Sequence, residues 1–230
     1  MLSLNKIEIA LGSFRLRADF QVEARQKVAV VGPSGAGKST LVGAVCGFID
    51  VLGGQLILAG QDITDAMPDK RDMAMLFQDN NLFPHLTIAQ NVGLGIRPVM
   101  RLTLDEKSKV NDALVRVGLG DLGSRKPSEL SGGQQSRAAL ARALVQSKLW
   151  MILDEPFAAL GPALRAEMLD LVAEVADETQ AGVMMVTHAP EDARRIADSV
   201  IFVVDGVAHG PQATTELLDN PPPALKAYLG

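Results

Sequence analysis

The chain has 230 residues, 47% of them apolar and 21% charged, with a formal net charge of −5. This length holds one sizeable domain or two small ones, and the composition argues against a disordered chain. The acidic balance argues against a nucleic-acid binder, because phosphate backbones reward basic surfaces. Cys46, the single cysteine, cannot form an internal disulfide and lies in an apolar run, which favours a reducing compartment and a buried thiol. We expect a soluble or peripheral protein, since no apolar run reaches the ~18 residues of a membrane span and no signal peptide is evident.

The N-terminal part predicts antiparallel strands. Leu4–Ala10 and Phe14–Val22 alternate apolar and polar side chains, a pattern typical of strands with one face in solvent. Gln55–Leu58 predicts a third strand of this kind, and a glycine-containing turn follows it. Between the second and third strands, Val28–Val31 is short and uniformly apolar, which indicates a buried strand of a parallel sheet.

A phosphate-binding loop directly follows Val28–Val31. It matches the pattern Gly-x4-Gly-Lys-Ser/Thr, and an apolar helical run comes after it. Small residues let backbone N–H groups surround phosphate oxygens, and the helix N-terminus adds a partial positive charge. Lys38 can reach the β- and γ-phosphates of a nucleotide, and the Ser39 hydroxyl can ligate Mg²⁺. The residues expected to bind the nucleotide here are Gly32, Pro33, Ser34, Gly35, Ala36, Gly37, Lys38, Ser39 and Thr40.

Helical patterns replace strand patterns between about residues 79 and 148. Val110–Val117 and Ser136–Gln146 are the clearest predicted helices, and the loops between them contain glycine and proline. We interpret this stretch as a helical subdomain inserted into an α/β core.

A second anion-binding motif lies within the helical stretch. Leu130-Ser131-Gly132-Gly133-Gln134 precedes the predicted helix Ser136–Gln146. Ser131 can cap that helix, and the two glycines permit close approach of a phosphate. Because the chain already has one complete phosphate loop, a second site is explained if it serves the nucleotide of another molecule.

Two acidic residues follow the next buried strand, Trp150–Leu153. Open parallel sheets bind ligands at the carboxyl ends of their strands, so Asp154 and Glu155 are expected beside the phosphate loop. Asp154 can hold Mg²⁺ directly or through water, and Glu155 can activate or orient the water that attacks the γ-phosphate. The alternative, two acids that merely cap a strand, is disfavoured by the phosphate loop.

The remaining chain alternates helices and strands. Ala163–Ala176 repeats apolar residues at helical spacing and predicts an amphipathic helix laid on the sheet. Val183–Thr187 and Val200–Val204 predict two further buried parallel strands, and Pro221–Pro223 indicate a peripheral tail. The fold class is therefore α/β: a P-loop nucleotide-binding core with a parallel sheet, an N-terminal antiparallel β subdomain and an inserted helical subdomain.

We expect three segments along the chain. Residues 1–78 hold the N-terminal strands and the nucleotide-binding core with its phosphate loop. Residues 79–148 form the helical subdomain with the second motif. Residues 149–230 complete the α/β core and include the C-terminal tail.

In this order the motifs resemble those of ATP-binding cassette (ABC) proteins, over nearly the whole chain. Ser131–Gln134 resembles the family's signature motif, which closes over ATP held by the opposite subunit. Gln78 matches the glutamine that links the nucleotide to the helical subdomain, and His188 matches the histidine that contacts the γ-phosphate. The resemblance implies the ABC ATPase fold. It implies catalytic roles for Glu155, His188, Gln78 and Lys38, Mg²⁺ ligands Ser39, Gln78 and Asp154, and contacts to the opposite subunit's ATP from Ser131, Gly132, Gly133 and Gln134.

Within the family, Asp79–Gly95 resembles the ATPase subunits of bacterial thiamine importers, although importers for iron, molybdate or polyamines share parts of it. The resemblance implies an ATP-hydrolysing head-to-tail dimer, peripheral on the cytoplasmic side of the inner membrane. Its partners would be permease subunits and, indirectly, a periplasmic solute-binding protein, with no nucleic acid. Leu82, Phe83 and Leu86 either line a groove for a short permease helix or pack the subdomain.

Three departures from the family pattern suggest slow hydrolysis. Gly161 stands where the family usually has an aspartate that helps to couple the two sites of the dimer. Gln135 replaces the first residue of the Arg-Gln-Arg that usually follows the signature. The aromatic residue that stacks on adenine is missing near Ile9–Gly12, where Phe14 is the only aromatic nearby, and such stacking is worth ~1–3 kcal/mol.

Two interpretations of another class stay open. A soluble cassette ATPase acting on DNA or ribosomes usually has a coiled-coil or zinc-binding insertion, or two fused cassettes, and this sequence shows none of these. A catalytically weak regulatory subunit is suggested by Gly161 and Gln135. ATP turnover with and without permease would separate the second from an importer ATPase.

Overall fold

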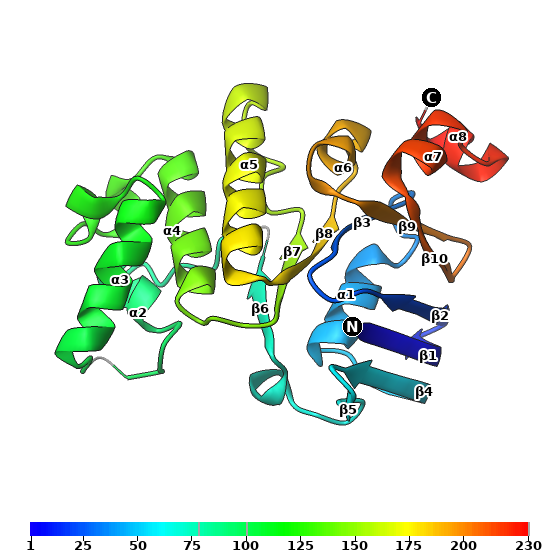
Figure 1. Ribbon diagram of the computed structural model, residues 1–230, viewed down its shortest axis with the longest axis horizontal. Helices are drawn as coiled ribbons and strands as arrows, with labels where there is room; N and C mark the ends of the chain where they lie inside the picture. The colour runs from blue at the N-terminus through cyan, green and yellow to red at the C-terminus, as the bar shows by residue number, and fades with distance from the viewer. Residues whose placement is uncertain (78, 100, 230) are drawn as a thin grey trace.

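The computed structural model describes residues 1–77, 79–99 and 101–229. Helices lie beside one long mixed sheet (Figure 1). Its strands are β1 (Leu2–Leu11), β2 (Phe14–Val22), β3 (Lys27–Val31), β4 (Val51–Leu58), β5 (Gln61–Asp62), β6 (Met73–Leu76), β7 (Trp150–Asp154), β8 (Gly182–Val186), β9 (Ser199–Val204) and β10 (Val207–Ala213). The α-helices are α1 (Lys38–Cys46), α2 (Ile88–Gly93), α3 (Leu104–Arg116), α4 (Gly132–Leu144), α5 (Pro162–Thr179), α6 (Pro190–Ile196), α7 (Thr214–Asp219) and α8 (Pro223–Leu229). Short 3₁₀ helices span Pro68–Lys70, Gly120–Leu122 and Pro127–Glu129.

β1 is the centre of the antiparallel part of the sheet, with β2 on one side and β4 on the other. Every second residue of β2 is buried from Leu16 to Val22, which the alternating sequence predicts. β10, which the sequence does not predict, runs parallel to β2 and antiparallel to β9. The predicted N-terminal strands are therefore confirmed, and they continue the main sheet instead of forming a sheet of their own.

The strands β9-β3-β8-β7-β6, in that spatial order, run parallel and carry the nucleotide motifs. β8 lies between β3 and β7, with Val186 opposite both Val30 and Asp154. Because parallel strands end at one edge of a sheet, the residues after β3, β7 and β8 must meet there. The four predicted parallel strands are confirmed, while β6 is a further strand that the sequence does not predict.

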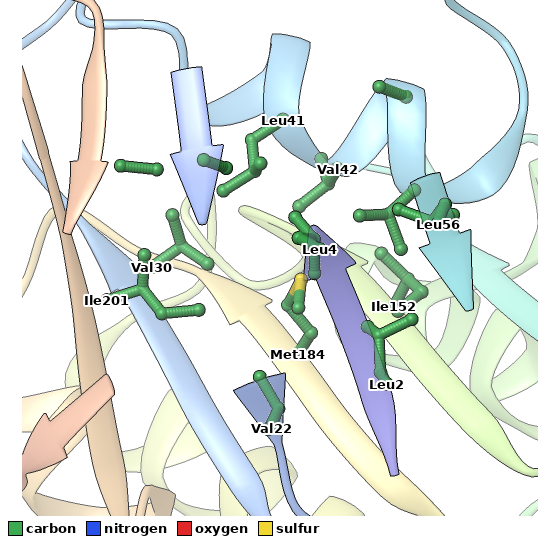
Figure 2. Close-up of a cluster of buried hydrophobic side chains, with 14 of the residues drawn as sticks. Leu2, Leu4, Val22, Val30, Leu41, Val42, Leu56, Ile152, Met184 and Ile201 are labelled. Atoms are coloured by element: carbon green, nitrogen blue, oxygen red, sulfur yellow. The ribbon is translucent and has the colours of Figure 1, made fainter. Parts of the chain in front are cut away.

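Helix α1, which follows the phosphate loop, is buried between the two parts of the sheet. Figure 2 shows its Leu41 and Val42 among Val30, Ile152 and Met184 of the parallel strands and Leu2, Leu4 and Leu56 of the antiparallel ones. Burying each such side chain stabilises the fold by about 1.5–3 kcal/mol. The loop is thus attached to a helix held from both sides.

Helices α2, α3 and α4 stand together at one end of the molecule (Figure 1), and the described part of residues 79–148 contains no strand. Their buried Ile88, Leu114 and Leu140 share one apolar cluster with Leu153 of β7 and Val172 of α5. The predicted helical stretch is confirmed and packs against the sheet and α5. None of the helices in the described ranges is long and apolar enough to cross a membrane.

Two of these helices begin earlier than the periodicity predicts. α4 begins at Gly132, not at Ser136, because Ser131 Oγ accepts the N–H of Gln134 and Gln134 Oε1 accepts the N–H of Ser131. α3 begins at Leu104, where Thr103 and Glu106 form the same capping box. The low helix propensity of two glycines after Ser131 hides this start from a periodicity argument.

The C-terminal tail is not peripheral, contrary to the prediction. Leu217 and Leu218 of α7 and Leu225 of α8 are buried against the sheet residues Val31 and Phe202. Pro223 begins α8, since proline fits the first turn of a helix. The tail therefore covers one face of β3 and β9.

Candidate functional site

The phosphate-binding loop joins β3 to α1 and is shaped by three glycines. Gly32, Gly35 and Gly37 have φ angles of 153°, 76° and 107°, which suit glycine. A Cβ at Gly32 would lie 2.1 Å from the carbonyl oxygen of Val203, so a side chain does not fit there. The other predicted loop residues, Pro33, Ser34 and Ala36, lie between these glycines, and Ser39 and Thr40 fall in the first turn of α1.

Lys38 is the first residue of α1, and its side chain folds back over the loop. Its Nζ donates to the carbonyl oxygens of Gly32 (2.8 Å) and Pro33 (3.0 Å). Burial lowers the pKa of Lys38, while the negative charges of Glu155 and Asp154 raise it. The ammonium group is therefore held at the loop and within electrostatic reach of both carboxylates.

Asp154 ends β7 and meets the phosphate loop, as predicted. Its Oδ1 accepts a hydrogen bond from Ser39 Oγ at 3.2 Å. Burial raises the pKa of Asp154; the hydrogen bond from Ser39 lowers it, the charge of Glu155 raises it, and the charge of Lys38 lowers it. The pair offers two oxygen ligands of the kind that Mg²⁺ prefers.

Glu155 and His188 lie together at the same edge. Glu155 Oε2 is 3.4 Å from His188 Nδ1. The Glu155 N–H donates to the carbonyl oxygen of Val186, and its φ is +47°, a conformation that costs a non-glycine residue about 1–3 kcal/mol. Such strain is typical of functional positions, and here it occurs at the predicted catalytic carboxylate.

The signature-like motif lies elsewhere in the chain. Ser131 and Gly132 are exposed at the start of α4, with Gln134 half-buried in the capping box. A Cβ at Gly133 would lie 2.4 Å from Leu164 Cδ2, so α4 packs closely on α5. In Figure 1, α5 and β7 stand between α4 and α1. One chain therefore brings together the loop, Asp154, Glu155 and His188, but not the second motif.

Gln78, predicted as a catalytic residue and Mg²⁺ ligand, lies outside the described residues. The chain after it is held firmly. Asn91, fully buried, accepts the N–H of Phe83 and donates to the carbonyl oxygens of Phe83, Leu86 and Thr87. Arg142 of α4 donates to the carbonyl oxygens of Asn80 and Asn81.

A groove of about 620 Å³ lies beside this segment. Its apolar lining includes Phe48, Met75, Phe77, Leu82 and Phe83, with Arg142 and Asp69 among its polar residues. Phe48 and Phe83 are 56% and 47% exposed, which is high for aromatic side chains. Of the three residues expected either to line a permease groove or to pack the subdomain, Leu82 and Phe83 line this groove and Leu86 does not, and the permease role stays a prediction.

The three departures have distinct structural settings. Gln135 Nε2 donates to the carbonyl oxygens of Pro127 and Leu130 and so holds the segment before the motif. Gly161 is the exposed N-cap of α5, with open space around it. Phe14 lies at the phosphate loop: a Cβ at Gly37 would come within 2.7 Å of its ring.

Comparisons with known proteins agree with this arrangement. A family model described as "ABC transporter" matches residues 16–158. The chain belongs to the ABC transporter family. It is 57% identical to the thiamine import ATP-binding protein ThiQ of Ruegeria sp. (strain TM1040) and 55% identical to that of Cereibacter sphaeroides, in each case over all of both chains. The dimeric structure of the bacterial ABC transporter cassette MJ0796 is 25% identical with a TM-score of 0.80, covering 93% of this chain and 99% of that one.

A second structure of that cassette is a dimer in a post-hydrolysis state bound to ADP and Pi, with a TM-score of 0.79 over the same shares of both chains. The predicted fold class is therefore confirmed, and the chain is an ATP-binding, ATP-hydrolysing cassette of an ABC transporter.

Several residues around His188 escape sequence reasoning in this cassette. The buried Thr187 and Asp192 and the part-buried Arg165 form a polar network next to it in the chain and through the fold. Tyr228 of α8 donates its hydroxyl to the carbonyl oxygen of His188 at 3.0 Å. The contacts made by Arg165 and Tyr228 span 22 to 40 positions in the chain, so no local pattern points to those two residues.

Proposed function

We propose that the chain hydrolyses Mg²⁺-ATP at an interface with a second copy of itself and so powers thiamine import through permease subunits. The observation that carries the thiamine assignment is the 57% identity, over the full length of both chains, to the thiamine import ATP-binding protein of Ruegeria. The cassette would lie on the cytoplasmic side of the inner membrane, and a periplasmic binding protein would deliver the solute to the permease.

The residues at the loop fit Mg²⁺-ATP. Ser39 and Asp154 present oxygen ligands that already lie 3.2 Å apart. The described residues contain no cluster of three or more His, Cys, Asp or Glu that could hold a metal by itself. This suits Mg²⁺, which commonly takes one or two protein ligands together with substrate phosphates. When bound, the ion would neutralise charge on the phosphates; Ser39 and Asp154 would hold it, with Gln78 as a further ligand.

Lys38, Glu155 and His188 would carry the chemistry. Lys38 would exchange its hydrogen bonds to the carbonyls of Gly32 and Pro33 for contacts with the β- and γ-phosphates. Glu155 would orient the attacking water or accept its proton, a role worth ~10²–10⁴ in rate. His188, 3.4 Å from Glu155, would contact the γ-phosphate.

The second copy would complete the site. Ser131, Gly132, Gly133 and Gln134 lie at the start of α4, away from their own chain's loop (Figure 1), and the first two of them are exposed. In a head-to-tail pair they would face the ATP of the other copy, so that each nucleotide belongs to the interface. ATP would favour the closed pair because its phosphates contact both halves, and hydrolysis would remove that preference.

The groove lined by Phe77, Leu82 and Phe83 would receive the permease. Much of its lining is apolar, and part of it belongs to the proposed helical subdomain at residues 79–148. A short amphipathic helix is the natural ligand of such a groove. Movement of α4 would then pass through Arg142, which holds Asn80 and Asn81, to the permease.

The hydrolysis and dimer proposals are tested with Glu155→Gln. We expect the purified wild type to release phosphate from Mg²⁺-ATP, and the variant to bind ATP without turnover and to accumulate as a dimer in light scattering. A wild type no faster than Glu155→Gln, even with its permease, would overturn hydrolysis and favour a regulatory subunit. A variant that stays monomeric at saturating ATP would overturn the proposed head-to-tail dimer.

The solute is tested with vesicles that contain the cassette, its permease and the binding protein. We expect ATP-dependent uptake of labelled thiamine, abolished by Glu155→Gln. Uptake of iron, molybdate or polyamines instead of thiamine would show that the transported solute is not thiamine. Co-purification with nucleic acid or ribosomes, and not with permease, would favour the soluble cassette class.

A further inference from the structure

The side chain of His188 makes few contacts that fix its position. Its imidazole is 53% exposed, and its close approach to Glu155 is a single 3.4 Å contact. A side chain with so few contacts is placed mainly by its backbone. The contacts that fix the backbone on either side of residue 188 therefore decide where the imidazole lies.

The hydroxyl group of Thr187 makes hydrogen bonds that fix the chain on both sides of His188. Thr187 is 2% exposed. Its Oγ1 donates to Asp192 Oδ2 at 2.7 Å and accepts the N–H of Ala189 at 3.1 Å. The same oxygen thus fixes the residue before His188 and the residue after it, and Asp192 ties both to α6.

Arg165 completes the network from another element. It forms a part-buried ion pair with the buried Asp192, and its Nη2 lies 3.5 Å from Thr187 Oγ1. Arg165 belongs to the first turn of α5, where its N–H donates to the carbonyl oxygen of Gly161. The network therefore joins the loop before α5 to the backbone that carries His188.

The network is not optimised for stability. The Nε of Arg165 is buried and has no hydrogen-bond partner, which costs about 1–3 kcal/mol. Buried ion pairs often add little stability over apolar side chains of similar volume. A role in orienting His188 therefore explains this network better than a contribution to the stability of the fold does.

We propose that Thr187, Asp192 and Arg165 are positioning residues that hold the His188 imidazole beside Glu155 and link it to the start of α5. This inference rests on the proposed hydrolysis. It adds that His188 acts only while this network is intact.

The test compares Thr187→Val, which keeps the shape and loses the hydroxyl, with Thr187→Ser, which keeps the hydroxyl. Thr214→Val is the matched control, because Thr214 is also a buried threonine whose hydroxyl donates a hydrogen bond, in this case to the backbone carbonyl of Ala197, away from the site. We expect Thr187→Val to lower kcat about 10- to 100-fold with KM for ATP little changed. Thr187→Ser should recover most of kcat, and Thr214→Val should keep it.

In a His188→Ala background, Thr187→Val should cost little more, because both changes remove the same contribution. Two results would overturn the proposal. One is a kcat for Thr187→Val that is no lower than the kcat for Thr214→Val. The other is a loss of kcat from Thr187→Val that is as large in the His188→Ala background as in the wild type. If Thr187→Val does not fold, Asp192→Asn replaces it with the same expectations.

A wild type that matches Glu155→Gln in turnover would mean that hydrolysis itself fails. The positioning proposal is then decided by crystal structures of wild type and Thr187→Val. We expect the distance from His188 Nδ1 to Glu155 Oε2 to exceed its wild-type value in the variant, and an unchanged distance would contradict the proposal.

Discussion

Asp154 carries a charge that the folded chain holds at a cost. Burial raises its pKa above the ordinary value of about 3.9, although Ser39 and Lys38 act in the other direction. Between the ordinary and the raised pKa, the folded chain binds a proton that the unfolded chain has lost. Stability contributed by this group is therefore present at low pH and lost as pH rises through that window.

Asp154→Asn should therefore be more stable than wild type at neutral pH in the absence of Mg²⁺ and ATP. The two proteins should converge in stability below about pH 4, where the carboxyl is protonated in both states. Urea unfolding across a pH series measures this. The variant should also lose Mg²⁺-dependent turnover. A stability difference that does not vary with pH would contradict the burial argument.

Cys46 behaves as a structural residue. The thiol is buried in α1, and burial raises its pKa to about 12. Because the thiolate is the reactive form, Cys46 should not react with a disulfide reagent at pH 8 in the native protein and should react fully in denaturant. Release of the coloured thiol product measures this, and rapid native reaction would show that the helix opens locally.

At the residue scale, the sequence predicts the positions of candidate site residues best where those residues are neighbours in the chain. The loop Gly32–Ser39 and the pair Asp154 and Glu155 are each consecutive, so strand, turn and helix signals locate them. Thr187 and Arg165 are adjacent only through the fold, and no spacing rule brings them together. Phe14 is an intermediate case: the sequence shows it as the only aromatic residue near Ile9–Gly12, and the structure places its ring against Gly37 of the phosphate loop.

At the scale of elements, the start of α5 offers a direct test of the missing aspartate. Gly161 is the N-cap, with ordinary φ of −64° and open space for a side chain. Asp is among the best N-cap residues, and replacing glycine also reduces the entropy of the unfolded chain.

Gly161→Asp should therefore raise the free energy of unfolding by about 0.5–1 kcal/mol. If the aspartate couples the two sites, turnover should also depend more steeply on ATP concentration. Urea unfolding measures the first effect and an ATP titration the second. Gly60→Asp is the control: Gly60 is an exposed turn glycine with positive φ, so this variant should be less stable than wild type. A Gly161→Asp variant less stable than wild type would contradict the N-cap geometry.

Elements were predictable where periodicity was strong. The parallel strands and α5 follow from apolar runs and helical spacing, whereas β10 contains Gly210 and Pro211 and exists because β2 and β9 flank it. The early start of α4 depends on capping by Ser131, and the placement of α8 depends on burial of Leu225. Tertiary contacts, and not local propensity, decide these cases.

At the scale of the whole molecule, the separation of the two phosphate-binding motifs is the central feature. The loop at α1 and the motif at α4 stand on opposite sides of α5 and β7 (Figure 1). In the proposed pair, each chain would therefore supply the phosphate loop of one ATP site and the signature-like motif of the other. The order of motifs along the sequence predicts both halves, but their separation is a property of the fold.

Mixing two defective variants tests the shared site most directly. Lys38→Ala breaks the phosphate loop, and Gly132→Asp, at an exposed glycine with no atom within 4 Å of a new Cβ, places a negative charge where the other copy's phosphates would bind. Each variant alone should be inactive. An equal mixture should recover about a quarter of wild-type turnover, because half of the pairs then contain one intact site out of two. A mixture as inactive as its components, with both variants folded, would contradict an ATP site built from two copies of this chain.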